Sequence, residues 1–172
     1  MSKKERFLEL CSKIKREGIE NLVNWLESSD FFYAPASTKF HGSYAGGLLE
    51  HSLNVYDELV RLLAAYPEVQ PAEETVIIIS LFHDLCKVNM YGLEKRNRRD
   101  ASGRWETYDT YTSDEKFHYG GHGSKSVFIL QNYIKISAEE AVAINCHMSC
   151  WDGNTSVGAA YEQYPLAWLL HV

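Results

Sequence analysis

The chain has 172 residues, 45% of them hydrophobic and 23% charged, and a formal net charge of −6. This size and composition predict one domain with a sizeable core, and the negative charge argues against nucleic acid as a bulk electrostatic partner. No apolar run is long enough to span a membrane and the charged N-terminus lacks a signal-peptide core, so we expect a cytoplasmic protein.

The first thirty residues are predicted to form a helical extension. Apolar residues recur at helical spacing from Phe7 to Leu26, and Gly18 marks a break in that pattern. A second amphipathic helix is predicted from about residue 46 to residue 65, with His51 near its apolar stripe. A lone histidine at such a position is more often a packed core residue than a metal ligand. His51 therefore becomes a candidate ligand only if it has partners further along the chain.

The strongest chemical signal is the adjacent pair His83 and Asp84, which follows an apolar run from Val76 to Phe82. A neutral imidazole and a carboxylate can both ligate one divalent ion, and an aspartate after an apolar run is costly unless it is paired or metal-bound. Neighbours on a helix do not share a face, so we expect the pair near a helix end or beside a cavity. The competing interpretation is a hydrogen-bonded pair in the core.

Residues 92–117 are predicted to form a β-hairpin inserted between helices. Two short polar strands flank a turn signal at Ser102 and Gly103, and the second strand alternates aromatic and β-branched residues with polar ones. The segment 94–104 holds five basic and two acidic residues. A solvated hairpin is the favoured interpretation, and a basic lid over a substrate is the alternative.

Two further histidines follow the hairpin. His122 lies among glycines that let the backbone approach closely at a helix start, and His118 is an alternative that the sequence does not eliminate. Ser137 and Glu140 form a capping-box pattern, which predicts the start of a helix that carries His147. A last helix is predicted from residue 165, where proline suits the first position.

The order of these histidines and the wording of segments 44–55 and 81–87 resemble the HD-domain superfamily of metal-dependent phosphohydrolases, especially its bacterial and prophage-type members. The resemblance covers roughly residues 30 to 172. It implies an all-α fold, an HD-domain helical bundle with the small hairpin inserted, in one domain over 1–172. It also implies a metal set, consisting of His51, His83, Asp84, His122 and His147.

Five ligands exceed what one open catalytic ion usually takes, so we expect two divalent ions with Asp84 between them. Nitrogen and oxygen ligands suit iron, manganese, zinc, nickel or cobalt and do not choose among them. A single ion, as in HD-type nucleotidases, is the alternative. The family closes its site with an aspartate on a late helix, but this sequence stops after His171 and Val172. We expect that the C-terminal end is truncated, or that the chain is naturally short and its site impaired.

The expected activity is hydrolysis of a phosphomonoester or phosphodiester of a small nucleotide-type substrate by metal-activated water. Asp84 and Lys87 are the expected catalytic residues. The candidate substrate contacts are Lys87, Lys125, His41 and Asp152, and for each of them a purely structural role is the alternative.

Two other functions stay open. One is a catalytically impaired HD domain that binds a nucleotide or serves as a phage accessory protein. The other is an exoribonuclease-like HD domain, against which the acidic net charge weighs. The sequence leaves the oligomeric state open.

Overall fold

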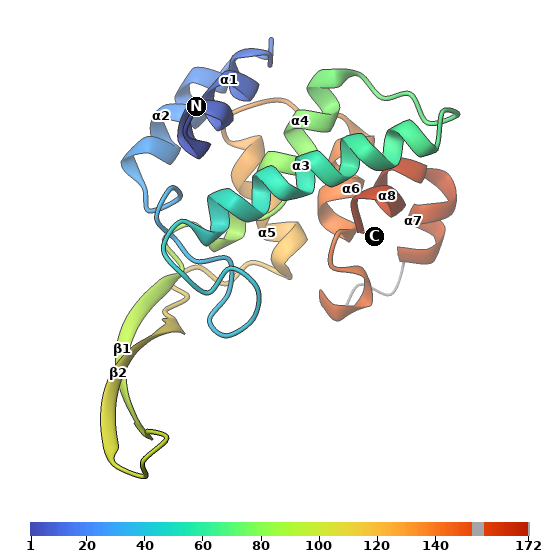
Figure 1. Ribbon diagram of the computed structural model, residues 1–172. Helices are drawn as coiled ribbons and strands as arrows, with labels where there is room; N and C mark the ends of the chain where they lie inside the picture. Colours follow the sequence, from blue (N-terminus) through green and yellow to red (C-terminus); the bar gives the residue numbers. More distant parts are fainter. Residues whose placement is uncertain (153–156, 172) are drawn as a thin grey trace.

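The computed structural model describes residues 1–152 and 157–171, with the side chain of residue 152 outside the described part. Its architecture is mostly helical with one small antiparallel hairpin, as predicted (Figure 1). The helices are α1 (Lys3–Ser12), α2 (Ile19–Ser28), α3 (Gly47–Ala65), α4 (Glu73–Phe82), α5 (His122–Gln131), α6 (Ala138–Cys146), α7 (Val157–Gln163) and α8 (Pro165–His171), with short 3-10 helices η1 (Leu85–Lys87) and η2 (Ser149–Asp152). The strands are β1 (Tyr91–Arg99) and β2 (Trp105–Ser113).

Local sequence signals explain where several helices begin and end. Gly18 has φ +91°, and a Cβ there would lie 1.9 Å from the carbonyl oxygen of Tyr133, so only glycine fits between α1 and α2. The predicted capping box at Ser137 and Glu140 is present at the start of α6, and Ser2 makes a second one at α1. The predicted break, caps and helix starts are therefore confirmed.

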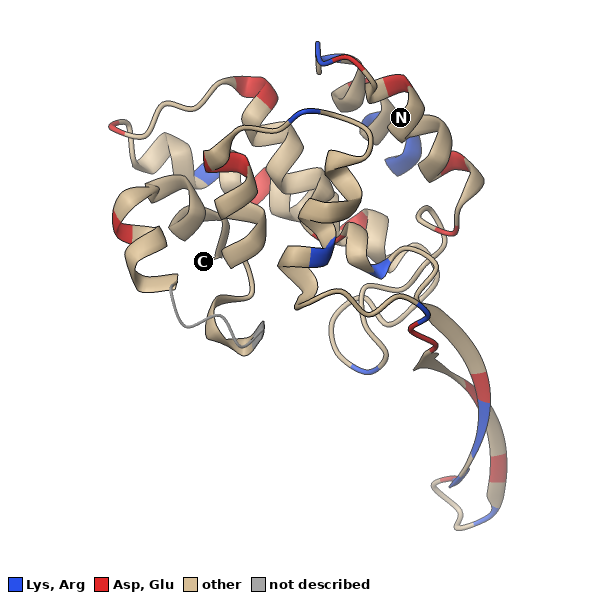
Figure 2. Ribbon diagram, turned by 180° about the vertical axis from the view of Figure 1, so that it is seen from behind, with Lys and Arg blue, Asp and Glu red and all other residues tan. Residues whose placement is uncertain are grey.

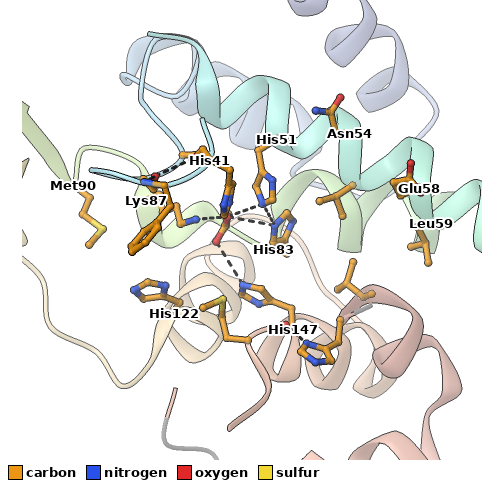
Figure 3. Close-up of a pocket in the computed structure, with 18 of the residues that line it drawn as sticks. His41, His51, Asn54, Glu58, Leu59, His83, Lys87, Met90, His122 and His147 are labelled. Atoms are coloured by element: carbon orange, nitrogen blue, oxygen red, sulfur yellow. Dashed lines mark hydrogen bonds and ion pairs between the residues drawn. The ribbon is translucent and has the colours of Figure 1, made fainter. Parts of the chain in front are cut away.

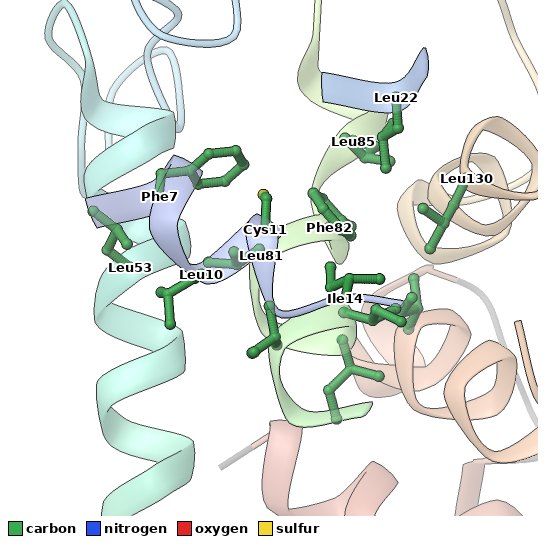
Figure 4. Close-up of a cluster of buried hydrophobic side chains, with 14 of the residues drawn as sticks. Phe7, Leu10, Cys11, Ile14, Leu22, Leu53, Leu81, Phe82, Leu85 and Leu130 are labelled. Carbon is green, nitrogen blue, oxygen red and sulfur yellow. The ribbon is translucent and has the colours of Figure 1, made fainter. Parts of the chain in front are cut away.

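Helix α4 forms the centre of the hydrophobic core. Every residue from Val76 to Phe82 is buried, and α1, α3 and α6 pack against this helix. Figure 4 shows how side chains of α1, including Phe7, converge on α4. The ring centroid of Phe7 lies 5.0 Å from that of Phe31 and 6.2 Å from that of Phe82. A helical segment that is apolar on every face is stable only when neighbouring elements bury it on every side. The end of this segment therefore lies inside the protein.

A buried ion-pair network ties the N-terminal segment to the core. Arg16, between α1 and α2, donates to both carboxylate oxygens of Glu140 at 2.6 and 2.7 Å, and to Glu74 at 3.3 Å. Thr75 donates to Glu140 at 2.8 Å. Burial alone would raise the pKa of the fully buried Glu140, but these hydrogen bonds hold it below its usual value. The network therefore joins the N-terminal extension, α4 and α6 through one carboxylate.

The hairpin projects away from the helices, and charges of both signs lie along it (Figures 1 and 2). Lys95 pairs with Asp109 at 3.3 Å and Arg98 with Glu106 at 2.6 Å, so much of its positive charge is neutralised within the hairpin. This pairing favours the solvated hairpin over the basic lid. Within 1–152 and 157–171, no helix combines the length and hydropathy needed to cross a membrane.

Candidate metal centre

Four elements bring titratable side chains to one place (Figure 3). Helix α3 carries His51, the end of α4 is followed by His83 and Asp84, α5 begins at His122, and His147 is the C-cap of α6. His83 keeps a helical backbone (φ −59°), whereas Asp84 leaves the helix (φ −108°, ψ 23°). This change of direction lets two neighbouring side chains approach one point, at the helix end where the sequence predicts them.

Asp84 lies at the centre of the cluster. Its Oδ2 is 3.2 Å from Nε2 of His51 and 3.3 Å from Nε2 of His83, and its Oδ1 is 3.5 Å from Nε2 of His147. Lys87, in η1, donates to Oδ2 at 2.7 Å. The side chain of Asp84 is only 2% exposed. A carboxylate so withdrawn from water needs positive charge or hydrogen-bond donors around it.

Backbone carbonyls fix the proton positions on two of the histidines. Nδ1 of His83 lies 2.8 Å from the carbonyl oxygen of Ser80, and Nδ1 of His147 lies 2.6 Å from that of Ile144. A carbonyl oxygen only accepts, so each Nδ1 carries the proton and each Nε2 presents a lone pair. Nε2 of His83 lies 3.1 Å from Nε2 of His51 and 3.3 Å from Oδ2 of Asp84, and Nε2 of His147 lies near Oδ1. Lone pairs repel a carboxylate, and a cation between them turns that repulsion into attraction.

Protonation of the His83 imidazole does not remove this conflict near neutral pH. Burial lowers the pKa of His83 to about 4, so its ring is neutral. Burial alone would raise the pKa of Asp84, but the Lys87 ammonium, which donates to Oδ2, holds it well below its usual value. Within the described residues, Nε2 of His147 and Nδ1 of His122 are buried without a hydrogen-bond partner. Buried nitrogens are normally satisfied, so both are free to ligate an ion.

The donor set fits a divalent metal ion. The ligand atoms of His51, His83 and Asp84 all lie within 4.8 Å of one another, close enough to surround one ion. Neutral imidazoles held by backbone carbonyls, together with an ionised carboxylate, are the ligands that zinc, iron and manganese take in proteins. His122 and His147 line the same cavity and add two further nitrogens.

The cluster opens into a cavity of about 790 Å³, a size that suits a small organic ligand. Near the cluster the cavity wall has polar residues beside the apolar Ala36, Phe40 and Met90, and the polar ones include Ser37, Thr38, His41, Lys87 and Tyr91. Further along α3 the wall becomes apolar, where the lining residues are Val55, Leu59, Leu62, Leu169 and Leu170. The cavity thus combines a charged end with an apolar end.

Among the polar lining residues that were not predicted as site residues are Asn54, Glu58 and Tyr91. Asn54 and Glu58 follow His51 at intervals of three and seven along α3, so helical spacing from His51 alone would have found them. Tyr91 comes from the base of the hairpin and is brought to the cavity by the antiparallel pairing of the two strands. No local pattern marks it.

The predicted residues that remain fall into different places. His41 lines the cavity, with its ring centroid 5.0 Å from that of His51. Lys125 is buried and donates to both oxygens of Glu115 at 2.7 Å, outside the cavity wall. His118 is exposed and does not line the cavity, whereas its alternative His122 does. The side chain of residue 152 lies outside the described part of the chain.

One curated protein is similar to this chain. The chain is 26% identical over 126 residues to the dihydroneopterin 2′,3′-cyclic phosphate phosphodiesterase of Methanocaldococcus jannaschii, an alignment that covers 64% of this chain and 48% of the relative. The chain thus spans about half the length of that protein. No protein-family model and no solved structure matches the chain. The chain is a distant homologue of a phosphodiesterase, and its membership of the HD superfamily stays a prediction.

Proposed function

We propose that the protein is a metal-dependent phosphoester hydrolase, built as a single domain of the HD type, with its site at His51, His83 and Asp84. One observation carries the proposal. The Nε2 atoms of His83 and His147 lie 3.3 and 3.5 Å from opposite oxygens of the buried Asp84 carboxylate. Lys87 already donates to Oδ2, whereas Nε2 of His147 on the Oδ1 side has no hydrogen-bond partner among the described residues. Divalent ions are what this donor set binds, and an ion there would give that nitrogen a partner.

The proposal includes two ions rather than one. Oδ2 of Asp84 lies beside His51 and His83, whereas Oδ1 lies beside His147. With imidazole nitrogens on both sides of Asp84, two ions would be held by Asp84, these three histidines and His122. Divalent ions held there supply Lewis acidity that activates water and neutralises charge on a phosphate.

The chain's own residues orient the substrate and balance its charge. Lys87 donates to Asp84 and would place its ammonium where non-bridging phosphate oxygens would lie. Burial, with the nearby charges of His51 and Lys87, lowers the pKa of His41, so its neutral ring offers an N–H donor to a phosphate oxygen. Both side chains line the same end of the cavity.

The substrate is proposed to be a small nucleotide-type phosphoester. The relative in M. jannaschii is named for a 2′,3′-cyclic phosphate, which contains a phosphodiester bond. A cavity of about 790 Å³ has room for a nucleotide but not for a folded nucleic acid. Our first candidate reaction is therefore cleavage of a phosphodiester bond in a cyclic nucleotide or related compound. Our second candidate is cleavage of a phosphomonoester.

The test is hydrolysis of bis(p-nitrophenyl) phosphate and p-nitrophenyl phosphate with added Mn²⁺, by the wild type and Asp84→Asn. We expect activity that EDTA abolishes. For the variant we expect a loss of at least about 10²-fold in kcat/KM. Mutation of a residue that hydrogen-bonds to a metal ligand already costs about 10- to 100-fold, and loss of the ligand itself should cost more. Asp109→Asn is the matched control, since Asp109 lies on the exposed hairpin and pairs with Lys95.

Two results would contradict the proposal. Hydrolysis that survives EDTA or Asp84→Asn would place the chemistry elsewhere. Metal binding without hydrolysis of any phosphoester would instead support the impaired, ligand-binding HD domain.

A further inference from the structure

The apolar end of the cavity follows one face of α3 away from the metal centre. The lining residues of α3 recur at helical spacing, and they are His51, Asn54, Val55, Glu58, Leu59 and Leu62. Figure 3 shows Asn54, Glu58 and Leu59 following His51 along this helix. Glu58 lies seven residues beyond His51, which corresponds to roughly 10 Å of helix rise. This separation is comparable to the length of a nucleotide from its phosphate to the far edge of its base.

The walls of this end suit the faces of a heterocycle. Leu59 and Leu62 of α3 lie on one side, and Leu169 and Leu170 of α8 line the same space. Aliphatic walls cover the faces of a ring but make no distinction among bases. Discrimination must come from a polar group at the edge of the ring.

Glu58 is the polar group placed to make that distinction. Apart from Asp84, it is the one acidic residue among the described residues of the cavity wall. Arg61 donates to Glu58 through Nε at 3.0 Å and through Nη2, and both hydrogen bonds go to Oε2. Oε1 accepts no hydrogen bond from the described side chains. The side chains of Arg61 and Glu58 are 75% and 59% exposed, so theirs is a surface ion pair, and it leaves Oε1 available to a ligand.

A carboxylate accepts hydrogen bonds and cannot donate them. It therefore matches a ring edge with two adjacent N–H donors and opposes an edge that presents a lone pair. Guanine has such an edge, formed by N1–H and the 2-amino group, and pterins carry the same 2-amino-4-oxopyrimidine edge. Adenine and cytosine place a ring-nitrogen acceptor beside their amino group, and uracil flanks its N–H with two carbonyls.

We propose that Glu58 makes this site selective for phosphoesters of a 2-amino-4-oxopyrimidine base, either guanine or a pterin. The phosphoester lies at the metal centre and the base lies between α3 and α8, with its donor edge on Glu58. The inference rests on the proposed phosphoester hydrolysis for the position of the phosphate. The selectivity itself depends only on the cavity and on Glu58.

The first experiment measures kcat/KM for the 2′,3′-cyclic phosphates of guanosine, adenosine and neopterin with the metal-loaded wild type and Glu58→Gln. We expect the wild type to prefer guanosine or neopterin over adenosine by about 10-fold, because adenosine presents a ring-nitrogen lone pair to the carboxylate where the other two present N–H donors. Glu58→Gln should lower that ratio by about 10-fold. Comparison of kcat/KM for the guanosine and neopterin substrates shows whether the site prefers guanine or a pterin.

Glu68→Gln is the matched control, since Glu68 is exposed and lies outside the cavity wall. It should leave the guanosine-to-adenosine ratio as in the wild type. Equal rates for guanosine and adenosine substrates, or an unchanged ratio in Glu58→Gln, would overturn the inference while leaving phosphoester hydrolysis intact.

A second measurement decides the inference without catalysis. Binding of guanosine and adenosine to the metal-free protein, followed by calorimetry, tests the base site alone. Guanosine should bind at least about 10-fold more tightly, and Glu58→Gln should remove the difference. If the wild type hydrolyses no phosphoester but keeps this preference, the proposed function fails and the base site stands. Equal binding of the two nucleosides overturns the base site.

Discussion

The loss of stability caused by Lys87→Met should depend on whether metal is bound. Lys87 Nζ lies 2.7 Å from Oδ2 of Asp84, and the side chains are only 9% and 2% exposed. Removal of one partner from such a pair leaves a buried, uncompensated charge and costs about 3–5 kcal/mol. In the metal-free protein, Lys87→Met should therefore lower the free energy of unfolding by about that amount.

Bound metal changes this expectation. Divalent ions at Asp84 supply the positive charge that Lys87 otherwise provides, so the cost of Lys87→Met should fall to about 1 kcal/mol in the metal-loaded protein. Urea unfolding with EDTA and with saturating Mn²⁺ measures both values. The difference between the two costs, about 2–4 kcal/mol, is the predicted quantity.

Lys125→Met is the matched control. Lys125 pairs with Glu115 at 2.7 Å, and its side chain is also 9% exposed, but neither residue lines the cavity. Its cost should be the same with EDTA and with Mn²⁺. If Lys87→Met costs the same under both conditions, Asp84 does not bind the metal and the reasoning is refuted.

Three further predictions concern Glu140, Phe7 and His147. Glu140→Gln should destabilise the protein by about 2–4 kcal/mol at pH 7, because it leaves Arg16 without its buried partner. Since the folded pKa of Glu140 is depressed, its contribution is present above about pH 4.5 and is lost as the pH falls, so the variant should show a flatter acid limb in stability against pH. Phe7→Ala should cost about 3–5 kcal/mol in chemical denaturation, because Phe7 is fully buried among aromatic rings. His147→Ala should lower the metal content, measured by plasma mass spectrometry, from about two equivalents to about one. The cluster of His51, His83 and Asp84 does not include His147 and should still bind one ion.

The local features of the fold were predictable from the sequence because each depends on a few neighbouring residues. Gly18 breaks a helix through its own backbone, and Ser137 caps one through a side chain three residues away from Glu140. The hairpin follows from strand-like alternation around a turn that contains Gly103, which has φ +83°. Such signals act within one element, so tertiary context did not override them.

The cluster was predictable only in part. The pairing of His83 with Asp84 at a helix end is visible in the sequence, and helical spacing from His51 reaches Glu58. By contrast, the role of a lysine depends on which carboxylate the fold places beside it. Lys87 meets Asp84 three residues away, whereas Lys125 meets Glu115 across the segment that joins the hairpin to α5. The i,i+3 spacing of Asp84 and Lys87 is visible in the sequence, whereas periodicity contains no information on the contact of Lys125 with Glu115.

The most direct test of the central claim is the metal content of the purified protein after supplementation, measured by plasma mass spectrometry alongside His83→Ala. The account predicts about two equivalents of a divalent transition metal in the wild type and in the control His118→Ala, because His118 is exposed and outside the cavity. His83→Ala should lose metal. A wild type that takes up no metal, or a His83→Ala variant that keeps it all, would contradict the account.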